Sequence, residues 1–176
     1  GVLACARRPR VPALEKLVRC LPPAATIAVC CGVQDPQNLG GILRSCAAFG
    51  VHAVLAARPS CDPYSRQVLR VSIGSVFRLP VVESAHLLDD LRWLKQRGGF
   101  QILAAVTDQD ALPMGQESRR PRTALVLGSE AEGLDPVIQS ACDLRICIPQ
   151  PGGIDSLNVS VAAGILLYEL SRSAAR

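Results

Sequence analysis

Apolar runs of strand length alternate along this chain with segments of helical periodicity, and this alternation constrains the fold most strongly. The runs are continuous, which is typical of strands buried on both faces of a parallel sheet, and the connecting helices cover those faces. We therefore expect an α/β fold. The predicted strands are residues 26–33, 52–57, 81–82, 101–106, 123–127 and 144–148, and the predicted helices are residues 14–20, 38–49, 64–70, 87–97, 136–141 and 156–171.

Length and composition indicate one domain with a short lead-in. The chain has 176 residues, of which 49% are hydrophobic, so it can bury a sizeable core. The regular pattern begins at residue 26, and we assign residues 26–176 to the domain and residues 1–25 to a lead-in or linker. No run approaches the roughly 18 apolar residues of a membrane span, so we expect no membrane contact.

The cysteines and histidines limit the metal chemistry that is open to the chain. There are eight cysteines and two histidines, and no two cysteines have the C-x-x-C spacing. We therefore expect no zinc or other metal site. Most of the cysteines lie in apolar segments, where Cys acts as a small hydrophobe. This usage indicates a reducing compartment rather than a secreted disulfide framework.

The basic residues are almost all arginine. The formal net charge is +4, and Lys occurs only at Lys16 and Lys95 among 19 basic residues. Arginine favours planar, bidentate contact with phosphate, so the composition suits an RNA partner. A GC-rich coding sequence gives the same bias, and this alternative stays open.

Residues 148–160 run from a predicted strand through a Pro/Gly turn into a long apolar helix. Three polar side chains open that helix: Ser156, Asn158 and Ser160. Backbone amides of the turn and polar side chains at a helix N-terminus suit a small polar ligand. Helix capping is the competing interpretation, although one residue would suffice for it.

Residues 35–50 contain a second group of polar side chains. Asn38 lies where a predicted strand passes into a helix, and Arg44 follows six residues later. In an open α/β sheet, ligands bind at this end of the strands. The alternative for Arg44 is an ion pair with a carboxylate on a neighbouring helix. Gly40 and Gly41 lie within the helix, where glycine permits close packing.

Residues 125–134 form the third segment. An apolar strand ends at Gly128, two carboxylates follow at Glu130 and Glu132, and Gly133 closes the loop. The glycines indicate a tight loop that admits a ligand to main-chain groups. The carboxylates have a second interpretation as solvated surface groups. The chain has neither the G-x-G-x-x-G nor the P-loop pattern, which disfavours an ordinary dinucleotide or P-loop site.

Together, the three segments resemble the three motifs of the SpoU/TrmH branch of the SPOUT RNA methyltransferases. Those motifs read N-x-G-x-x-x-R-x-x-x-x-F-G, then G-x-E-x-x-G-(L/I), then I-P-M-x-G-x-x-x-S-L-N-V-S-x-A. The match covers nearly all of residues 26–172. One departure is Gln150, which stands where Met is common; the resemblance implies that this position contributes mainly its backbone.

The resemblance implies a parallel sheet covered by helices on both faces, with a C-terminal deep trefoil knot that brings the loop after residue 127 beside residues 148–153. These two segments would hold S-adenosylmethionine in a bent shape. The implied catalytic residues are Asn38, Arg44, Glu130, Ser156 and Asn158. The implied cofactor-binding residues are Leu127, Gly128, Ser129, Glu130, Gly133, Ile148, Pro149, Gln150, Gly152, Ser156, Leu157 and Asn158.

The implied reaction is methyl transfer to a ribose 2′-hydroxyl of RNA, and we expect a guanosine of large-subunit ribosomal RNA as the target. A guanidinium holds its proton too tightly to act easily as the base, so we expect Arg44 to bind phosphate and stabilise the developing alkoxide. Glu130 would orient Arg44 or the ribose. The alternatives are ribose or base methylation of tRNA, and a non-catalytic RNA-binding or ribosome assembly factor with the same fold.

The resemblance also implies a homodimer and an upstream RNA-binding domain. The apolar helix face that we expect at the dimer interface comprises Val159, Ala162, Ala163, Leu166 and Leu170. The expected compartment is the mitochondrial matrix, with the cytosol as the alternative.

Overall fold

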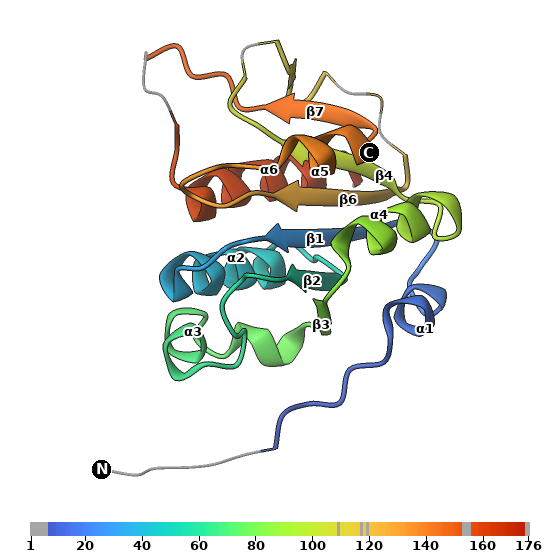
Figure 1. The fold of residues 1–176 in the computed structure, drawn as a ribbon, viewed down its shortest axis with the longest axis vertical. Helices are drawn as coiled ribbons and strands as arrows, with labels where there is room; N and C mark the ends of the chain where they lie inside the picture. Colours follow the sequence, from blue (N-terminus) through green and yellow to red (C-terminus); the bar gives the residue numbers. More distant parts are fainter. Residues whose placement is uncertain (1–6, 109, 117, 119, 153–155, 175–176) are drawn as a thin grey trace.

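The computed structural model describes residues 7–108, 110–116, 118, 120–152 and 156–174. Its centre is a seven-stranded sheet with the order β3-β2-β1-β6-β4-β7-β5, and every described strand pair is parallel (Figure 1). The strands are β1 (Ala25–Cys31), β2 (Ala53–Ala57), β3 (Val81–Ser84), β4 (Gln101–Ala105), β5 (Leu112–Pro113), β6 (Arg122–Leu127) and β7 (Leu144–Cys147). The predicted α/β fold is confirmed.

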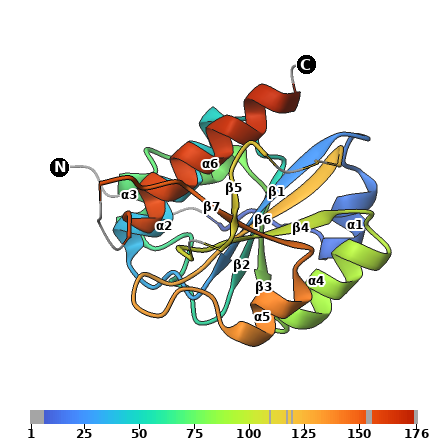
Figure 2. The same cartoon turned by 90° about the horizontal axis from the view of Figure 1, so that it is seen from above.

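Helices cover both faces of the sheet (Figure 2). One face carries α2 (Pro36–Ala48), α3 (Arg66–Val71), the 3-10 helix η1 (Ser75–Arg78) and α6 (Val159–Ala174). The other carries α1 (Leu14–Arg19), α4 (Leu87–Gln96) and α5 (Pro136–Ala141). The buried side chains accordingly form two hydrophobic clusters, one on each side of the sheet. Burial on both sides explains why the strands are apolar throughout.

Two differences from the predicted elements have local causes. The last helix begins at Val159 rather than at residue 156, because the side chain of Asn158 accepts hydrogen bonds from the first free amides of α6. Strand β5 has two residues, too few for an alternating or continuous apolar pattern. No helix in the described part of the chain is both long and apolar enough to cross a bilayer. The trefoil knot stays a prediction.

The two glycines predicted to permit close packing lie against neighbouring helices. A Cβ atom at Gly40 would lie 2.6 Å from the Cβ of Val71 in α3, and one at Gly41 would lie 3.0 Å from the Cβ of Ser160 in α6. Glycine at these two positions therefore allows α2 to approach both of its neighbours. This packing fixes the position of the first turn of α2, which carries Asn38.

Candidate functional site

Strands β1 and β6 are neighbours, and the chain leaves them in opposite directions across the sheet. β1 leads to β2 on one side, whereas β6 leads to β7 on the other. Such a reversal opens a crevice outside the carboxyl ends of the two strands. Asn38 lies in the helix that follows β1, and Glu130 lies in the loop that follows β6, so the topology alone brings these distant residues to one place.

Asn38 lies in the first turn of α2 and is only 7% exposed. The start of the helix is fixed by Asp35, whose Oδ1 accepts a hydrogen bond from Gln37 N at 2.8 Å, and by Pro36 in the first turn. Asn38 Nδ2 donates to Glu130 Oε1 at 2.6 Å. The first and second predicted segments are therefore joined directly.

Asn158 joins the third segment to the other two. Its Oδ1 accepts from Ser160 N at 2.9 Å, and its Nδ2 donates to Asn38 Oδ1 at 2.9 Å. Because a backbone N–H can only donate, the amide of Asn158 has one orientation, and this in turn fixes the amide of Asn38. Asn158 therefore caps α6, and the same side chain also lines the cavity described next.

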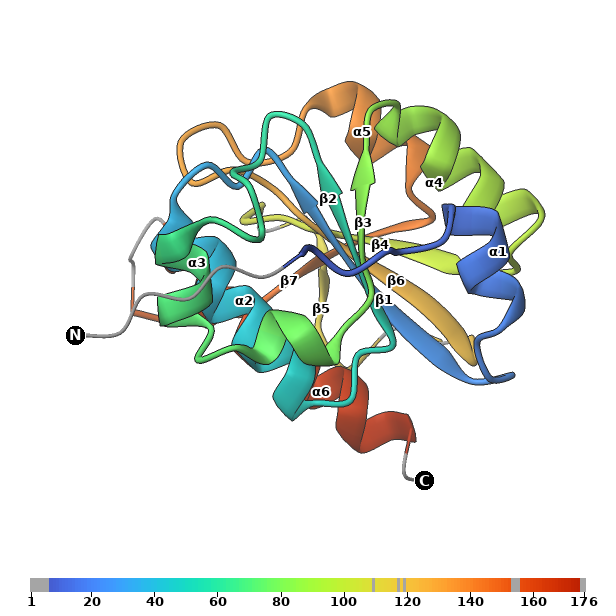
Figure 3. The same ribbon diagram turned by 90° about the horizontal axis from the view of Figure 1, so that it is seen from below.

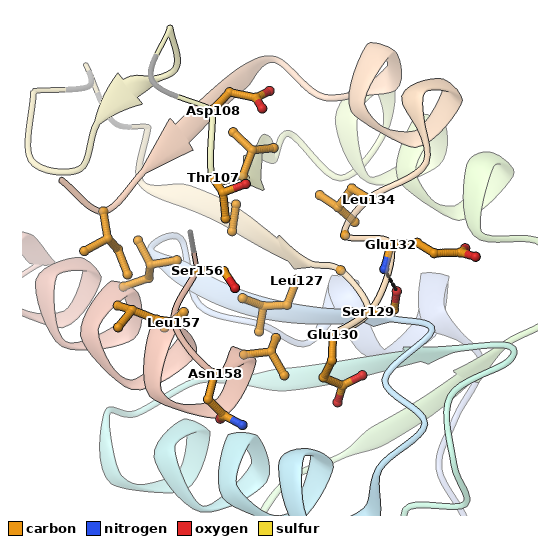
Figure 4. A pocket seen from close by; sticks show the side chains of 18 of the residues that line it. Thr107, Asp108, Leu127, Ser129, Glu130, Glu132, Leu134, Ser156, Leu157 and Asn158 are labelled. Carbon is orange, nitrogen blue, oxygen red and sulfur yellow. Dashed lines mark hydrogen bonds between the residues drawn. The ribbon is translucent and has the colours of Figure 1, made fainter. Parts of the chain in front are cut away.

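A cavity of about 520 Å³ opens beside this chain of hydrogen bonds, a volume within the range of small-molecule sites. Figure 4 shows Ser156, Leu157 and Asn158 along one side and Ser129, Glu130 and Glu132 on the opposite side. The predicted residues that line the cavity are Leu127, Gly128, Ser129, Glu130, Gly133, Ile148, Gln150, Ser156, Leu157 and Asn158.

Four predicted residues lie outside the cavity lining. Pro149 and Gly152 are exposed on the turn after β7. Asn38 reaches the cavity only through its bonds to Glu130 and Asn158. Arg44 is exposed on α2 and makes no hydrogen bond or ion pair with any described residue. Its expected alternative partner, a carboxylate on a neighbouring helix, is therefore not found among those residues.

Sequence reasoning missed part of the cavity lining. One wall follows β4, where the polar pair Thr107 and Asp108 directly succeeds a buried strand, and this strand-end position was the available signal. The other lining residues were not predicted as site residues, and most of them are apolar or small: Ala105, Val106, Ala131, Glu132, Leu134, Gln139, Ile146, Val159, Ala162 and Leu166.

The loop after β6 is a tight turn that only glycine permits. Ser129 and Gly133 form an antiparallel bridge, and Ser129 Oγ accepts from Glu132 N at 3.1 Å. A Cβ atom at Gly128 would lie 2.3 Å from the carbonyl carbon of Gly133, which is backbone and cannot rotate away. Gly133 itself has a φ of 68°. The two glycines predicted to shape this loop therefore do so.

Gln150 is one of the residues that line the cavity. Its Oε1 atom is buried and has no hydrogen-bond partner in the described structure. A buried acceptor without a partner costs free energy, so this atom is available to a ligand that donates a hydrogen bond. The expectation that this position acts mainly through its backbone stays a prediction.

One ionisable group beside the site has a perturbed pKa. Burial raises the pKa of the Cys61 thiol, and the nearby carboxylates of Asp35, Asp62 and Glu130 raise it further against an opposing backbone hydrogen bond. Cys61 therefore lies within electrostatic reach of Glu130 and stays a thiol at neutral pH. Within the described ranges, no three His, Cys, Asp or Glu residues cluster in a way that could hold a metal ion.

Fold and site together define a class of protein: an α/β domain with a ligand cavity at the carboxyl edge of its sheet, where three distant segments meet through amide and carboxylate groups. The model of the SpoU rRNA Methylase family matches residues 25–168. The chain belongs to this family.

Relatives of known sequence and structure agree with this membership. The chain is 37% identical over 176 residues to an uncharacterized tRNA/rRNA methyltransferase of Mycobacterium bovis, covering 98% of this chain and 60% of the relative. It is 40% identical over 163 residues to the 23S rRNA (guanosine-2'-O-)-methyltransferase RlmB of Nitrosomonas europaea, covering 93% and 62%. The chain thus spans about three fifths of the length of these curated relatives.

Solved structures show the same fold. An rRNA methyltransferase of Sinorhizobium meliloti with bound AdoMet superposes with a TM-score of 0.80 at 30% identity, covering 89% of this chain and 60% of that one. The SpoU methyltransferase AviRb of Streptomyces viridochromogenes superposes with a TM-score of 0.83 at 26% identity, covering 94% and 65%.

Proposed function

We propose that this chain transfers a methyl group from S-adenosylmethionine to a ribose 2′-hydroxyl of RNA, and that the target is a guanosine of large-subunit ribosomal RNA. The observation that carries the proposal is the hydrogen-bonded series Asn158–Asn38–Glu130 at the rim of a cofactor-sized cavity. The relative of Nitrosomonas europaea is named for guanosine 2'-O-methylation of 23S rRNA, and this supports the choice of substrate.

The cavity suits a cofactor with an apolar nucleoside part and polar ends. Leu127, Ile148 and Leu157 supply apolar surface for a flat base, and the loop after β6 supplies main-chain groups. The unpartnered Oε1 of Gln150 fits a ligand that carries amino or ammonium groups. AdoMet is present in the related structure from Sinorhizobium meliloti. When bound, S-adenosylmethionine supplies a methyl group that is already activated for transfer.

The residues of the chain have to orient the ribose and stabilise charge, because the donor is already reactive. Glu130 holds Asn38 rather than Arg44, so Glu130 fixes the amide that faces the ribose. Arg44 has no carboxylate partner among the described residues, so its guanidinium is available to bind a phosphate next to the target nucleotide. We assign Arg44 to stabilisation of the developing alkoxide, with phosphate or water as the proton acceptor.

The test is tritium transfer from labelled S-adenosylmethionine to unmodified large-subunit rRNA and tRNA transcripts. Ribose methylation of rRNA supports the proposal. Transfer to tRNA alone or to a base would replace the substrate, and no transfer to any transcript despite cofactor binding would favour a non-catalytic RNA-binding or assembly role. Arg44→Ala should remove most turnover but leave cofactor affinity within a few-fold in calorimetry, whereas Arg97→Ala on the opposite face should change neither.

We further propose that the active form is a homodimer, although through a different face of α6 from the one expected. Ala163, Leu166 and Leu170 are buried within the chain and belong to its core. The apolar side chains that α6 exposes are Val161, Ile165 and Tyr168. Light scattering of the wild type and of Ile165→Asp tests this: a dimer that dissociates in the variant supports the interface, and an unchanged mass argues against it.

We also propose a reducing compartment, with the mitochondrial matrix ahead of the cytosol. Seven cysteines in the described residues carry free thiols. Burial raises the pKa of the Cys30 thiol to about 12, and this keeps the group protonated and unreactive. Cell fractionation with a tagged chain decides between the two compartments.

A further inference from the structure

The outward face of α3 and the turn that follows it expose a basic and apolar surface. We call this the α3 surface and define it by Arg66, Arg70, Ile73, Phe77 and Arg78, all of which are exposed. Ile73 is 69% exposed, the largest value for a large hydrophobic residue described in this chain, and Phe77 is 57% exposed. Large exposed apolar groups surrounded by charge indicate an interaction site.

The α3 surface combines one side of α3 with the turn and the 3-10 helix η1 that follow it. Arg66 and Arg70 are four residues apart in α3 and so lie on one side of that helix, whereas Ile73 follows the helix with a positive φ of 51°. The opposite side carries Val68, which is buried, and Val71, which contacts α2 at Gly40. α3 therefore has an inner face that is committed to the core and an outer face that no described residue covers.

The arginines of the α3 surface are not neutralised within the chain. Arg66, Arg70 and Arg78 make no ion pair with any described residue. Asp62, which precedes α3, already pairs with Arg8, and Arg8 belongs to the lead-in segment that passes the β3 edge of the sheet (Figure 3). Because Asp62 is paired with Arg8, it does not neutralise the arginines of the α3 surface. The surface therefore remains positively charged and can attract an external anion.

Phe77 lies next to a second aromatic ring. Its ring centroid is 6.2 Å from that of Tyr64, in a tilted arrangement, and the guanidinium of Arg8 lies 5.5 Å from the centroid of the Tyr64 ring. The ring of Tyr64 is therefore contacted by both Phe77 and Arg8, whereas the ring of Phe77 is exposed. An exposed aromatic ring beside unpaired arginines is the combination that binds single-stranded nucleic acid, because bases stack on the ring and phosphates pair with the guanidinium groups.

The α3 surface adjoins the candidate active site. Cys61 N donates to Val33 O at 2.9 Å, and Val33 N donates to Ser60 Oγ at 3.1 Å, so the loop before α3 is bonded to the loop before α2. α2 carries both Asn38 and Arg44. An RNA strand whose ribose lies at Asn38 would thus extend over Arg44 onto the outer face of α3.

We propose that the α3 surface binds the single-stranded RNA that flanks the target nucleotide, with one base stacked on Phe77 against Ile73 and its phosphates on Arg66 and Arg70. This inference rests on the proposed function, because it names the path of the same substrate. The unpaired positive charge favours RNA over a second protein as the occupant.

The experiment compares Phe77→Ala and Phe77→Trp with Val137→Ala, which truncates another exposed apolar residue on the opposite side of the sheet. Full-chain variants are assayed for methyl transfer to an unmodified large-subunit rRNA transcript and for S-adenosylmethionine affinity by calorimetry. Phe77→Ala should raise KM for RNA about tenfold with kcat and cofactor affinity unchanged, since one base loses its stacking partner. Phe77→Trp should restore KM, and Val137→Ala should behave as wild type.

A second arm tests the phosphate contacts by binding of a labelled oligouridylate at several salt concentrations. The double variant Arg66→Gln/Arg70→Gln should lower the slope of log affinity against log salt by about 1.4, or about 0.7 for each lost contact, and Arg97→Gln should not.

An unchanged KM in Phe77→Ala overturns the proposal, as does a change in oligomeric mass without a change in RNA affinity, which would indicate a protein partner. Absence of methyl transfer by the wild type would instead refute the proposed function, while the oligouridylate arm still tests the surface.

Discussion

Asn38 Nδ2 donates a hydrogen bond to Glu130 Oε1 at 2.6 Å and so connects two residues that lie 92 positions apart in the sequence. The other end of the Asn38 amide accepts from Asn158 Nδ2 at 2.9 Å. Three segments of the chain are therefore held together by one nearly buried amide. Because each bond has a fixed direction, the arrangement tolerates no exchange of donor and acceptor.

Asn38→Asp tests that directionality. The substitution replaces a donor by an oxygen that faces Glu130, and two carboxylates at this distance raise the pKa of one of them. The variant should lose about 2 kcal/mol of stability at pH 7 and should transfer methyl groups about a hundredfold more slowly. Stability should recover as the pH falls through the raised pKa, because a shared proton restores the bond. Urea unfolding across pH measures this, and equal destabilisation at every pH would contradict it.

Asn158 has two roles that substitution can separate. Asn158→Asp keeps the oxygen that caps α6 and places a negative charge at the helix N-terminus, which is favourable. It removes the donor to Asn38. We therefore expect stability near that of the wild type with a large loss of methyl transfer, whereas Asn158→Ala should lose about 1 kcal/mol as well. If Asn158→Asp retained full activity, the bond to Asn38 would have no part in the reaction.

The architecture could be predicted from the sequence because its signals are local. Continuous apolar runs such as residues 101–106 indicate strands buried on both faces, and Gly50 and Gly99 end helical segments with positive φ. The two-residue strand β5 and the 3-10 helix η1 lacked such signals. Their conformations depend on neighbouring parts of the fold rather than on their own residues.

The members of the site could be predicted in part, but their partners could not. Motif order identified Asn38, Glu130 and Asn158, yet it assigned Glu130 to Arg44 or the ribose rather than to Asn38. Which side chains meet depends on the order of the strands in the sheet, here on the adjacency of β1 and β6. Local periodicity in the sequence does not determine strand order. Likewise, only the structure shows that Gln150 Oε1 is buried and has no hydrogen-bond partner among the described residues.

Gly128 and Gly152 lie in two loops near the cavity, and they differ in how closely other atoms approach them. A Cβ atom at Gly128 would overlap the backbone of Gly133, whereas one at Gly152 would meet no atom of the described residues within 4 Å. Gly128→Ala should therefore cost about 2 kcal/mol and weaken S-adenosylmethionine binding at least about tenfold. Gly152→Ala should change stability by less than about 0.5 kcal/mol. Thermal unfolding and calorimetry measure both effects, and equal behaviour of the two variants would show that the close approach at Gly128 is unimportant.

Gln150→Met should raise stability and lower cofactor affinity at once. Without ligand, Gln150 Oε1 is a buried acceptor that lacks a partner among the described residues, and replacing the side chain by a thioether of similar size should stabilise the free protein by about 1 kcal/mol. If the ligand donates a hydrogen bond to this atom, affinity for S-adenosylmethionine should fall about fivefold in calorimetry. A gain in stability with unchanged affinity would mean that the oxygen faces away from the ligand.

Ile73 is the one described residue other than glycine with a positive φ, at 51°. A β-branched side chain is strained in this conformation, and an exposure of 69% means that burial does not offset the cost. Asn adopts the left-handed region more readily, so Ile73→Asn should stabilise the fold by about 1 kcal/mol and raise Tm by about 3 °C. Ile73→Val, which keeps the branch, should give no gain in stability.

If Ile73 supports an RNA base as proposed, the more stable Asn variant should also bind RNA more weakly. This exchange of stability for binding would explain why a strained apolar residue stands there. A lower Tm in Ile73→Asn would show instead that the isoleucine packs against the fold.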